Sequence, residues 1–264
     1  MDLTTLLGII IGLGGVIGGF LIEGGHLGSL FVGSSGAIVL GGTIGAVVMS
    51  FGLAELKTVP GFLKTVFTDS SIDFSGSVES LVETADRARR EGLLSLESHL
   101  PEIENDFMRR GLQLVIDGTD PELTRNMLEM EIASYEQGQN LGVEIFNSAG
   151  GFAPTMGIIG TVMGLVHVLG NISDPDTLAP AIASAFIATL YGIATANLLW
   201  IPFATKIKIK ASRQVSHMEL ILEGILSVQA GENPRVIREK LLTFLPEKDR
   251  EAQLAVDEAA GMGM

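Results

Sequence analysis

Four long apolar windows without acidic or basic residues constrain this chain more than any other feature of its sequence. The first two run from Leu3 to Ile22 and from Gly28 to Ala54. The other two run from Ile145 to Ser173, interrupted only by His167, and from Thr177 to Thr205. A helix needs about 20 residues to cross a hydrocarbon core of about 30 Å. The sequence therefore predicts an all-α integral membrane protein with four transmembrane helices.

The distribution of basic residues predicts how these helices are oriented. Of the 17 Lys and Arg residues, 8 lie between Glu55 and Glu144 and 9 lie after Thr205. The short loops at residues 23–27 and 171–176 contain none. Because cytoplasmic loops carry the excess of Lys and Arg, we expect both short loops to face outward. The N- and C-termini are then both cytoplasmic.

These observations divide the chain into four segments. They are 1–54 (transmembrane helices 1 and 2), 55–144 (a helical cytoplasmic domain), 145–205 (transmembrane helices 3 and 4) and 206–264 (cytoplasmic C-terminal helices and tail). Apolar residues follow a helical spacing from Phe74 to Glu97. Asp120, followed by Pro121 and an acidic first turn, predicts the cap of a helix that can continue into the third span.

Composition excludes several classes of function. The chain has no cysteine, so it can form neither disulfides nor a thiolate metal site. A net charge of −14 argues against nucleic acid as a partner, because a phosphate backbone attracts a basic surface. We predict no catalytic residues, no metal site and no bound cofactor, and we do not expect an enzyme.

Inside the spans, an absence is the most informative feature. None of the four windows contains Asp, Glu, Lys or Arg, although a proton relay within a membrane normally needs an ionisable group. Either another chain supplies a carboxylate or the protein moves no ion. The spans do offer hydroxyl groups at Thr161 and Thr189, which can alternatively bond to their own helices. Gly160 and Gly164 follow the small-xxx-small spacing of closely packed helices.

Three stretches carry a resemblance to a known family. They are residues 87–97 (RARREGLLSLE), residues 153–165 (APTMGIIGTVMGL) and residues 188–192 (ATLYG), the last followed by Pro202. With these stretches the chain resembles the MotA/PomA family, the ring-forming subunits of the flagellar-motor stator. The resemblance covers nearly the whole chain and implies a multi-pass protein of the bacterial cytoplasmic (inner) membrane.

The resemblance also implies partners. Family members assemble as a homopentamer around two copies of MotB, whose single membrane helix carries an essential aspartate and so supplies the missing carboxylate. By position, Arg89, Arg90 and Glu97 match residues that contact the rotor protein FliG. If one helix runs through this stretch, Arg89 and Glu97 lie about 80° apart on its surface, so one face presents both. Membrane lipid is the remaining expected partner.

The ion path is implied in the same way. Pro154 and Pro202 match two prolines on which the family's conformational change depends, while Thr161 and Thr189 match hydroxyl positions near the partner's aspartate. Sodium-driven members tend to have a threonine where this chain has Ala188. Because one fewer oxygen ligand makes sodium harder to dehydrate, the transported ion is expected to be H⁺, with Na⁺ as the alternative.

Other functions remain open from the sequence alone. An ExbB/TolQ-like energiser of outer-membrane processes resembles this family around the ion path but typically has three spans. A self-contained transporter is disfavoured by the charge-free spans, and a passive membrane scaffold is the remaining alternative.

Two features lie near the inner boundary of the membrane. Residues 59–67 have the spacing of an interfacial helix, or alternatively of a short helix buried in the cytoplasmic domain. Trp200 lies near the inner end of the fourth span, where its indole N–H is expected to stay hydrated.

Overall fold

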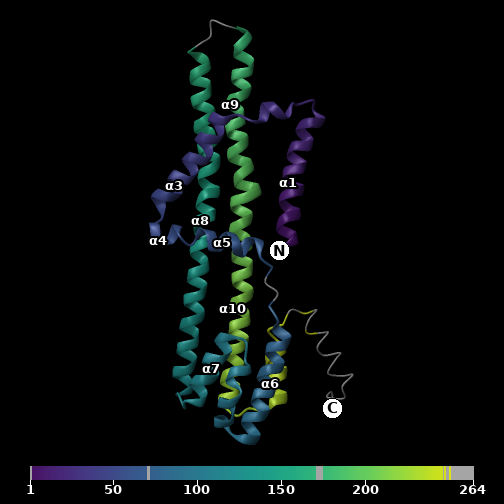
Figure 1. The fold of residues 1–264 in the computed structure, drawn as a ribbon, viewed down its shortest axis with the longest axis vertical. Helices are drawn as coiled ribbons and strands as arrows, with labels where there is room; N and C mark the ends of the chain where they lie inside the picture. Colours follow the sequence, from purple (N-terminus) through teal and green to yellow (C-terminus); the bar gives the residue numbers. More distant parts are fainter. Residues whose placement is uncertain (1, 70–71, 171–174, 246, 248–249, 251–264) are drawn as a thin grey trace. The chain divides into compact units, whose positions relative to one another are not determined.

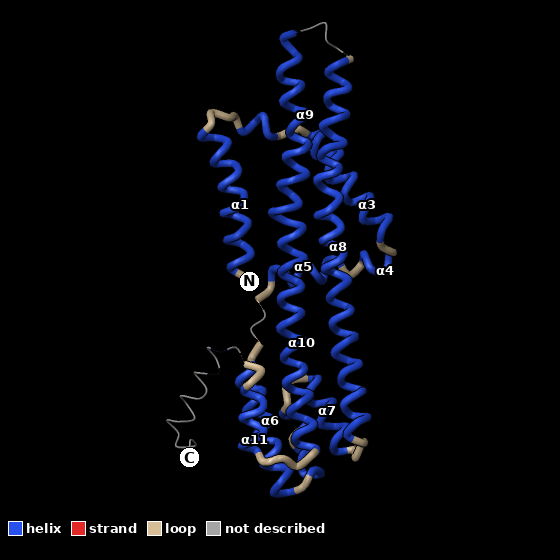
Figure 2. The backbone as a smooth tube through the Cα atoms, turned by 180° about the vertical axis from the view of Figure 1, so that it is seen from behind, coloured by secondary structure: helices blue, strands red, loops and turns tan. Residues whose placement is uncertain are grey.

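The computed structural model describes residues 2–69, 72–170, 175–245, 247 and 250, with helices joined by short turns and no strand in these ranges (Figures 1 and 2). The all-α class is confirmed. Helices long and apolar enough to cross a membrane number four over the same ranges, as predicted. Most of the predicted outward loop at 171–176 and the end of the tail, 251–264, lie outside the described residues.

The chain divides into two compact units. Unit 1 contains residues 1–70 and 138–209, and unit 2 contains residues 71–137 and 210–264. Unit 1 therefore includes residues 55–70, which the sequence boundaries place in the cytoplasmic segment. Two long helices contribute residues to both units.

Unit 1 contains the apolar helices. From the N-terminus it has α1 (Leu3–Ile22), η1 (Leu27–Leu30), α2 (Gly33–Gly36), the π-helical turn η2 (Ala37–Gly41), α3 (Gly42–Ser50), α4 (Leu53–Leu56) and α5 (Val59–Phe67). The second predicted span is thus built of several short helical pieces. The remaining elements are α8 (Pro121–Leu169), α9 (Pro175–Thr195), the π-helical turn η5 (Ala196–Trp200) and the start of α10 (Ile201–Gln229).

The long helix α8 confirms the prediction made from its cap. It runs for 49 residues without interruption. The Asp120 carboxylate accepts hydrogen bonds from the backbone N–H groups of Glu122 and Leu123, at 2.9 and 3.3 Å. These bonds satisfy donors that a helix start otherwise leaves free.

Helix α5 packs against the apolar helices of unit 1. Its buried side chains Phe62 and Val66 join a cluster with Phe146 of α8 and Phe203 of α10, while Lys64 on the opposite face is exposed. The alternative of a helix buried in the cytoplasmic domain is therefore wrong. An amphipathic helix with one face on unit 1 is compatible with an interfacial position, which stays a prediction.

The environment of the Trp200 indole differs from the predicted one. Its ring stacks against Phe146 with centroids 6.2 Å apart. The indole Nε1 is buried and has no hydrogen-bond partner among the described residues. The expectation of a hydrated N–H is wrong for this chain, because local packing covers the nitrogen.

Unit 2 is a helical domain with its own core. Its elements are α6 (Phe74–Glu91), η3 (Leu93–Ser98), η4 (Leu100–Glu102), α7 (Asp106–Ile116), α11 (Pro234–Leu242) and the adjoining parts of α8 and α10. Fully buried leucine and isoleucine side chains fill the core, including Leu81, Leu112, Ile221 and Ile237. Burying such side chains is the main favourable term in folding.

Two ion pairs of the partly buried Glu223 connect three helices of unit 2. Glu223 on α10 accepts from Lys240 of α11 at 2.9 Å and from Arg125 of α8 at 3.2 Å. Burial alone would raise the pKa of the Glu223 carboxyl, but the two cations outweigh it and the pKa lies below its ordinary value. Glu223 therefore stays ionised and holds α8, α10 and α11 in register.

Candidate functional site

Helices α8 and α9 of unit 1 lie side by side (Figure 1), and at two glycines their backbones come into contact. A Cβ atom added at Gly157 of α8 would lie 2.8 Å from the carbonyl oxygen of Ala188. A Cβ atom added at Gly192 of α9 would lie 2.5 Å from the carbonyl oxygen of Ala153. Only glycine fits at these two positions, so these glycines permit the close contact.

The two predicted hydroxyl groups meet at this contact. Thr161 Oγ1 and Thr189 Oγ1 are 2.5 Å apart. Thr161 Oγ1 also lies 3.1 Å from the carbonyl oxygen of Gly157 and 3.0 Å from that of Ala185. A hydroxyl has one proton to donate, so when Thr161 donates to a carbonyl, Thr189 donates to Thr161. The bond to its own helix exists, but it is one of several and does not account for the pair.

Ala188 lies at the same contact and is almost completely buried. It is 1 % exposed, and its Cβ would be 2.7 Å from a Cβ atom added at Gly160. A larger side chain at position 188 would have to push α8 away. This packing gives a structural reason why position 188 holds alanine and not a threonine, which would add a third hydroxyl to the contact.

The two predicted prolines occupy different parts of unit 1. Pro154 lies inside α8, and its Cα would be 3.1 Å from a Cβ atom added at Gly192, so it takes part in the α8–α9 contact. Pro202 lies in the first turn of α10, directly after the π-helical turn η5, and is exposed. The structure brings Pro154 close to the α9 contact but places Pro202 in a separate pocket.

The predicted rotor-contact residues are exposed, but they do not share one helix. Helix α6 ends at Glu91, and Gly92 follows with φ +87° and ψ 159°, a conformation that is essentially restricted to glycine. Arg89 and Arg90 close α6, whereas Glu97 lies on η3. The prediction that one helix face presents both Arg89 and Glu97 is therefore wrong, because α6 ends at Gly92, between them.

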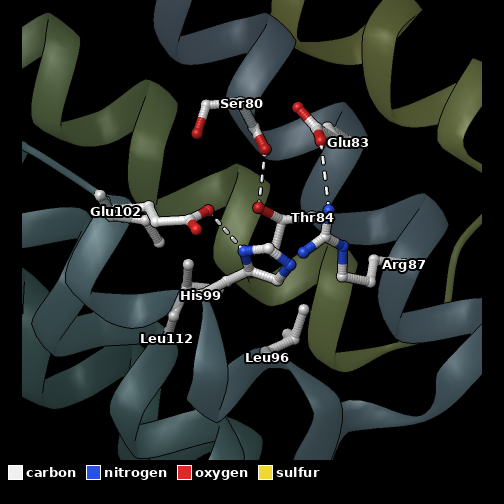
Figure 3. A pocket seen from close by; sticks show the side chains of 9 residues that line it. Ser80, Glu83, Thr84, Arg87, Leu96, His99, Glu102 and Leu112 are labelled. Atoms are coloured by element: carbon white, nitrogen blue, oxygen red, sulfur yellow. Dashed lines mark hydrogen bonds and ion pairs between the residues drawn. The ribbon is translucent and has the colours of Figure 1, made fainter.

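Sequence reasoning missed a pocket beside this stretch in unit 2 (Figure 3). Glu83 and Arg87 of α6 form an ion pair at 3.4 Å on one side. His99 Nδ1 lies 2.6 Å from a Glu102 carboxylate oxygen on the other, and Leu96 contributes an apolar wall. The signal was present as charged pairs three and four residues apart.

A second pocket that the sequence analysis did not single out lies in unit 1 between α2, α8 and α9. Ser34, Ser35, Ser184 and His167 contribute its polar lining. The Ser35 hydroxyl donates to the backbone carbonyl of Ser184 at 3.4 Å. The adjacent serines in an otherwise apolar window were the available signal.

Two family models match the chain. The model of the MotA/TolQ/ExbB proton channel family matches residues 99–220, and the motility protein A N-terminal model matches residues 6–92. Together they cover most of both units.

Individual proteins match over nearly the full length. Motility protein A of Bacillus subtilis is 38% identical over 251 residues, covering 95% of this chain and 93% of that protein. The chemotaxis protein PomA of Vibrio alginolyticus is 37% identical over 258 residues, covering 98% and 100%.

Solved structures agree with these matches. The flagellar MotAB stator complex from Bacillus subtilis superposes with a TM-score of 0.90 at 38% identity, covering 95% of this chain and 99% of that one. The C. jejuni MotAB structure gives a TM-score of 0.89 at 32% identity, covering 94% and 97%.

Proposed function

Because this chain belongs to the motility protein A (MotA/PomA) family, we propose that it is a stator subunit of the bacterial flagellar motor, converting an ion-motive force into torque. The observation that carries this proposal is the likeness to MotAB stator complexes over nearly the whole chain. The ExbB/TolQ-like alternative shares one family model with the chain. The full-length relatives, however, are motility proteins.

The charge-free spans support a partner that brings its own acid. A proton relay needs an ionisable group at membrane depth, and the four apolar windows provide no carboxylate. We infer that the partner is MotB, with two copies inside a pentamer of this chain, in the cytoplasmic membrane and with both termini of this chain cytoplasmic. The glycines of α1 support contacts with neighbouring chains, since added Cβ atoms at Gly8, Gly14, Gly15 and Gly18 would meet nothing within 4 Å.

The hydroxyl pair supports a role on the ion path. Thr161 and Thr189 supply hydroxyl groups to an α8–α9 contact that also contains glycine, alanine and Pro154. We propose that they face the partner's aspartate as an ion passes. Protons are favoured over sodium, because the packing around Ala188 leaves no room for a further oxygen ligand.

Torque transfer is assigned to unit 2. Arg89, Arg90 and Glu97 are exposed, so they are available to charged groups of the rotor protein FliG. Each neutralisation of the partner's aspartate would change its fit to the ring, and one charge crossing 100 mV is worth about 2.3 kcal/mol. That is enough to drive a conformational step.

Deleting the gene and restoring it on a plasmid tests the proposal. We expect deletion to abolish swimming while leaving flagella assembled, and the restored gene to recover it. Normal swimming combined with loss of an outer-membrane import function would replace the proposal with the energiser alternative. Swimming speed measured against external sodium, at fixed proton-motive force, tests the ion, since speed that rises with sodium would contradict proton coupling.

A further inference from the structure

Helix α1 has an unusual position in unit 1, because it buries none of its own residues. Leu3 is 71% exposed and Ile22 is 89% exposed. In Figures 1 and 2 it stands to one side of the α8 and α9 pair, away from α3. Within this chain, α1 therefore has few contacts that can hold it against the other helices of unit 1.

Asp2 provides one group of these contacts at the start of α1. Its backbone N–H donates to the carbonyl oxygen of Phe67, the last residue of α5, at 2.8 Å. Its carboxylate caps α1 by accepting from the N–H of Thr5 at 3.2 Å. The residue is only 9% exposed although it is an acid. Buried carboxylates persist where hydrogen bonds or cations compensate them.

Lys206 of α10 provides the compensating charge. Its ammonium lies 2.8 Å and 2.9 Å from the two carboxylate oxygens of Asp2 and 2.7 Å from the hydroxyl of Thr4. An ammonium has three protons to donate, and these three acceptors match that number. The Asp2–Lys206 pair therefore fastens α1 and α5 to α10, across 204 residues of sequence.

The part of α10 reached by this pair adjoins an irregular section of the fourth span. The π-helical turn η5 ends at Trp200, and Pro202 follows it. Proline has no backbone N–H, so the Leu198 carbonyl loses its usual donor four residues later. π-Helical turns and prolines are the common sites of helix bending.

Helix α1 contacts this section at two points, one within the π-helical turn and one beyond Pro202. At the first point, the Leu198 side chain lies 2.9 Å from the position of a Cβ atom at Gly12. At the second point, Lys206 holds Asp2. A pocket lined by Thr4, Gly8, Leu198, Pro202 and Lys206 lies between the two contacts.

We propose that the Asp2–Lys206 pair is a positioning latch that holds α1 as a splint across Pro202, between Leu198 and Lys206 of the fourth span. This inference rests on the proposed stator function. With the latch closed, a displacement of α9 is passed along α10. With the latch open, part of that displacement is lost as bending of the helix at Pro202, between Leu198 and Lys206.

A set of four variants and a control tests the latch in the full-length protein purified with its partner. Lys206→Met removes the Lys206 ammonium from the buried Asp2 carboxylate, and we expect the thermal midpoint to fall by about 4 °C or more. Asp2→Asn keeps a good cap residue and should cost less. The double variant Asp2→Asn with Lys206→Met should be more stable than Lys206→Met alone. Lys206→Arg should behave like wild type, and so should the matched control Lys208→Met, which changes an exposed lysine on the same helix.

The positioning role is tested by measuring the stall torque per stator in cells that contain equal amounts of the stator protein in the membrane. We expect Lys206→Met to lower it about twofold or more, and Lys206→Arg and Lys208→Met to leave it unchanged. Strictly additive thermal effects would overturn the latch. Coupled thermal effects with wild-type torque in every variant would overturn its role in positioning. If deleting the gene leaves swimming intact, the stator function fails, while the thermal cycle still decides whether the latch exists.

Discussion

The close contact between α8 and α9 predicts that the substitution Gly192→Ala destabilises the protein and weakens the motor. The added Cβ would lie 2.5 Å from the Ala153 carbonyl oxygen and 3.1 Å from the Cα atoms of Pro154 and Gly157. All of these are backbone atoms, so no side chain can rotate away. A carbon normally stays about 3.3 Å or more from such an oxygen. The helices would therefore have to separate by roughly 0.8 Å.

The separation has two measurable costs. Overpacking of a close contact costs about 1–3 kcal/mol, of which the better helix propensity of alanine returns about 1 kcal/mol. The same displacement, added to the 2.5 Å between Thr161 Oγ1 and Thr189 Oγ1, would stretch that pair to about 3.3 Å, beyond an ordinary O–H···O hydrogen bond. We therefore expect both a less stable protein and a weakened motor.

The assay is thermal unfolding of the purified complex, with swimming speed measured at equal membrane abundance. Each kcal/mol corresponds to about 2–4 °C in the midpoint for a chain of this size. Gly138→Ala is the matched control, because it lies in α8 and a Cβ there would meet nothing within 4 Å. That control should be neutral or slightly stabilising. A Gly192→Ala protein that melts at or above the wild-type temperature would refute the reasoning.

Three further predictions concern single residues. Burial lowers the pKa of His217 below its ordinary 6.5, with Asp73 opposing this only in part. The unfolded chain therefore binds more protons than the folded one below pH 6.5, so stability is full above that pH and falls as the pH drops below it. In unfolding experiments from pH 7.5 to 5, His217→Gln should flatten this slope. Thr189→Val should cost about 0.5–1.5 kcal/mol of stability, since it removes one hydrogen bond of Thr161, yet reduce stall torque severely, whereas full torque would remove the hydroxyl from the ion path. Gly92→Ala should destabilise the chain by about 1–3 kcal/mol because of its φ of +87°, and an unchanged midpoint would contradict the assignment of strain there.

Much of the fold was predictable because it depends on neighbours in the sequence. A charge-free window of sufficient length must find an apolar environment, and this property belongs to the window alone. Helix caps are equally local, since Asp120 and Asn233 bond to N–H groups two or three residues ahead. The start of the long helix α8 and of α11 could therefore be placed from sequence.

Local signals were also misread in places. The apolar spacing from Phe74 to Glu97 continues past the end of α6. The periodicity therefore predicted a single helix where the structure has an α-helix followed by a separate 3₁₀ helix. Gly92 was the signal that should have ended it. The predicted rotor-contact residues are exposed as expected, but their relative placement depends on the backbone at this glycine.

The sequence by itself determined that this chain has four apolar helices with no fixed charge of their own, because hydropathy and charge are properties of each segment. Only the tertiary structure decided which distant groups meet. Thr161 and Thr189 are 28 residues apart, and Asp2 and Lys206 are 204 apart. Such pairs form because backbone packing brings their helices together, and no periodicity within either helix encodes the partner.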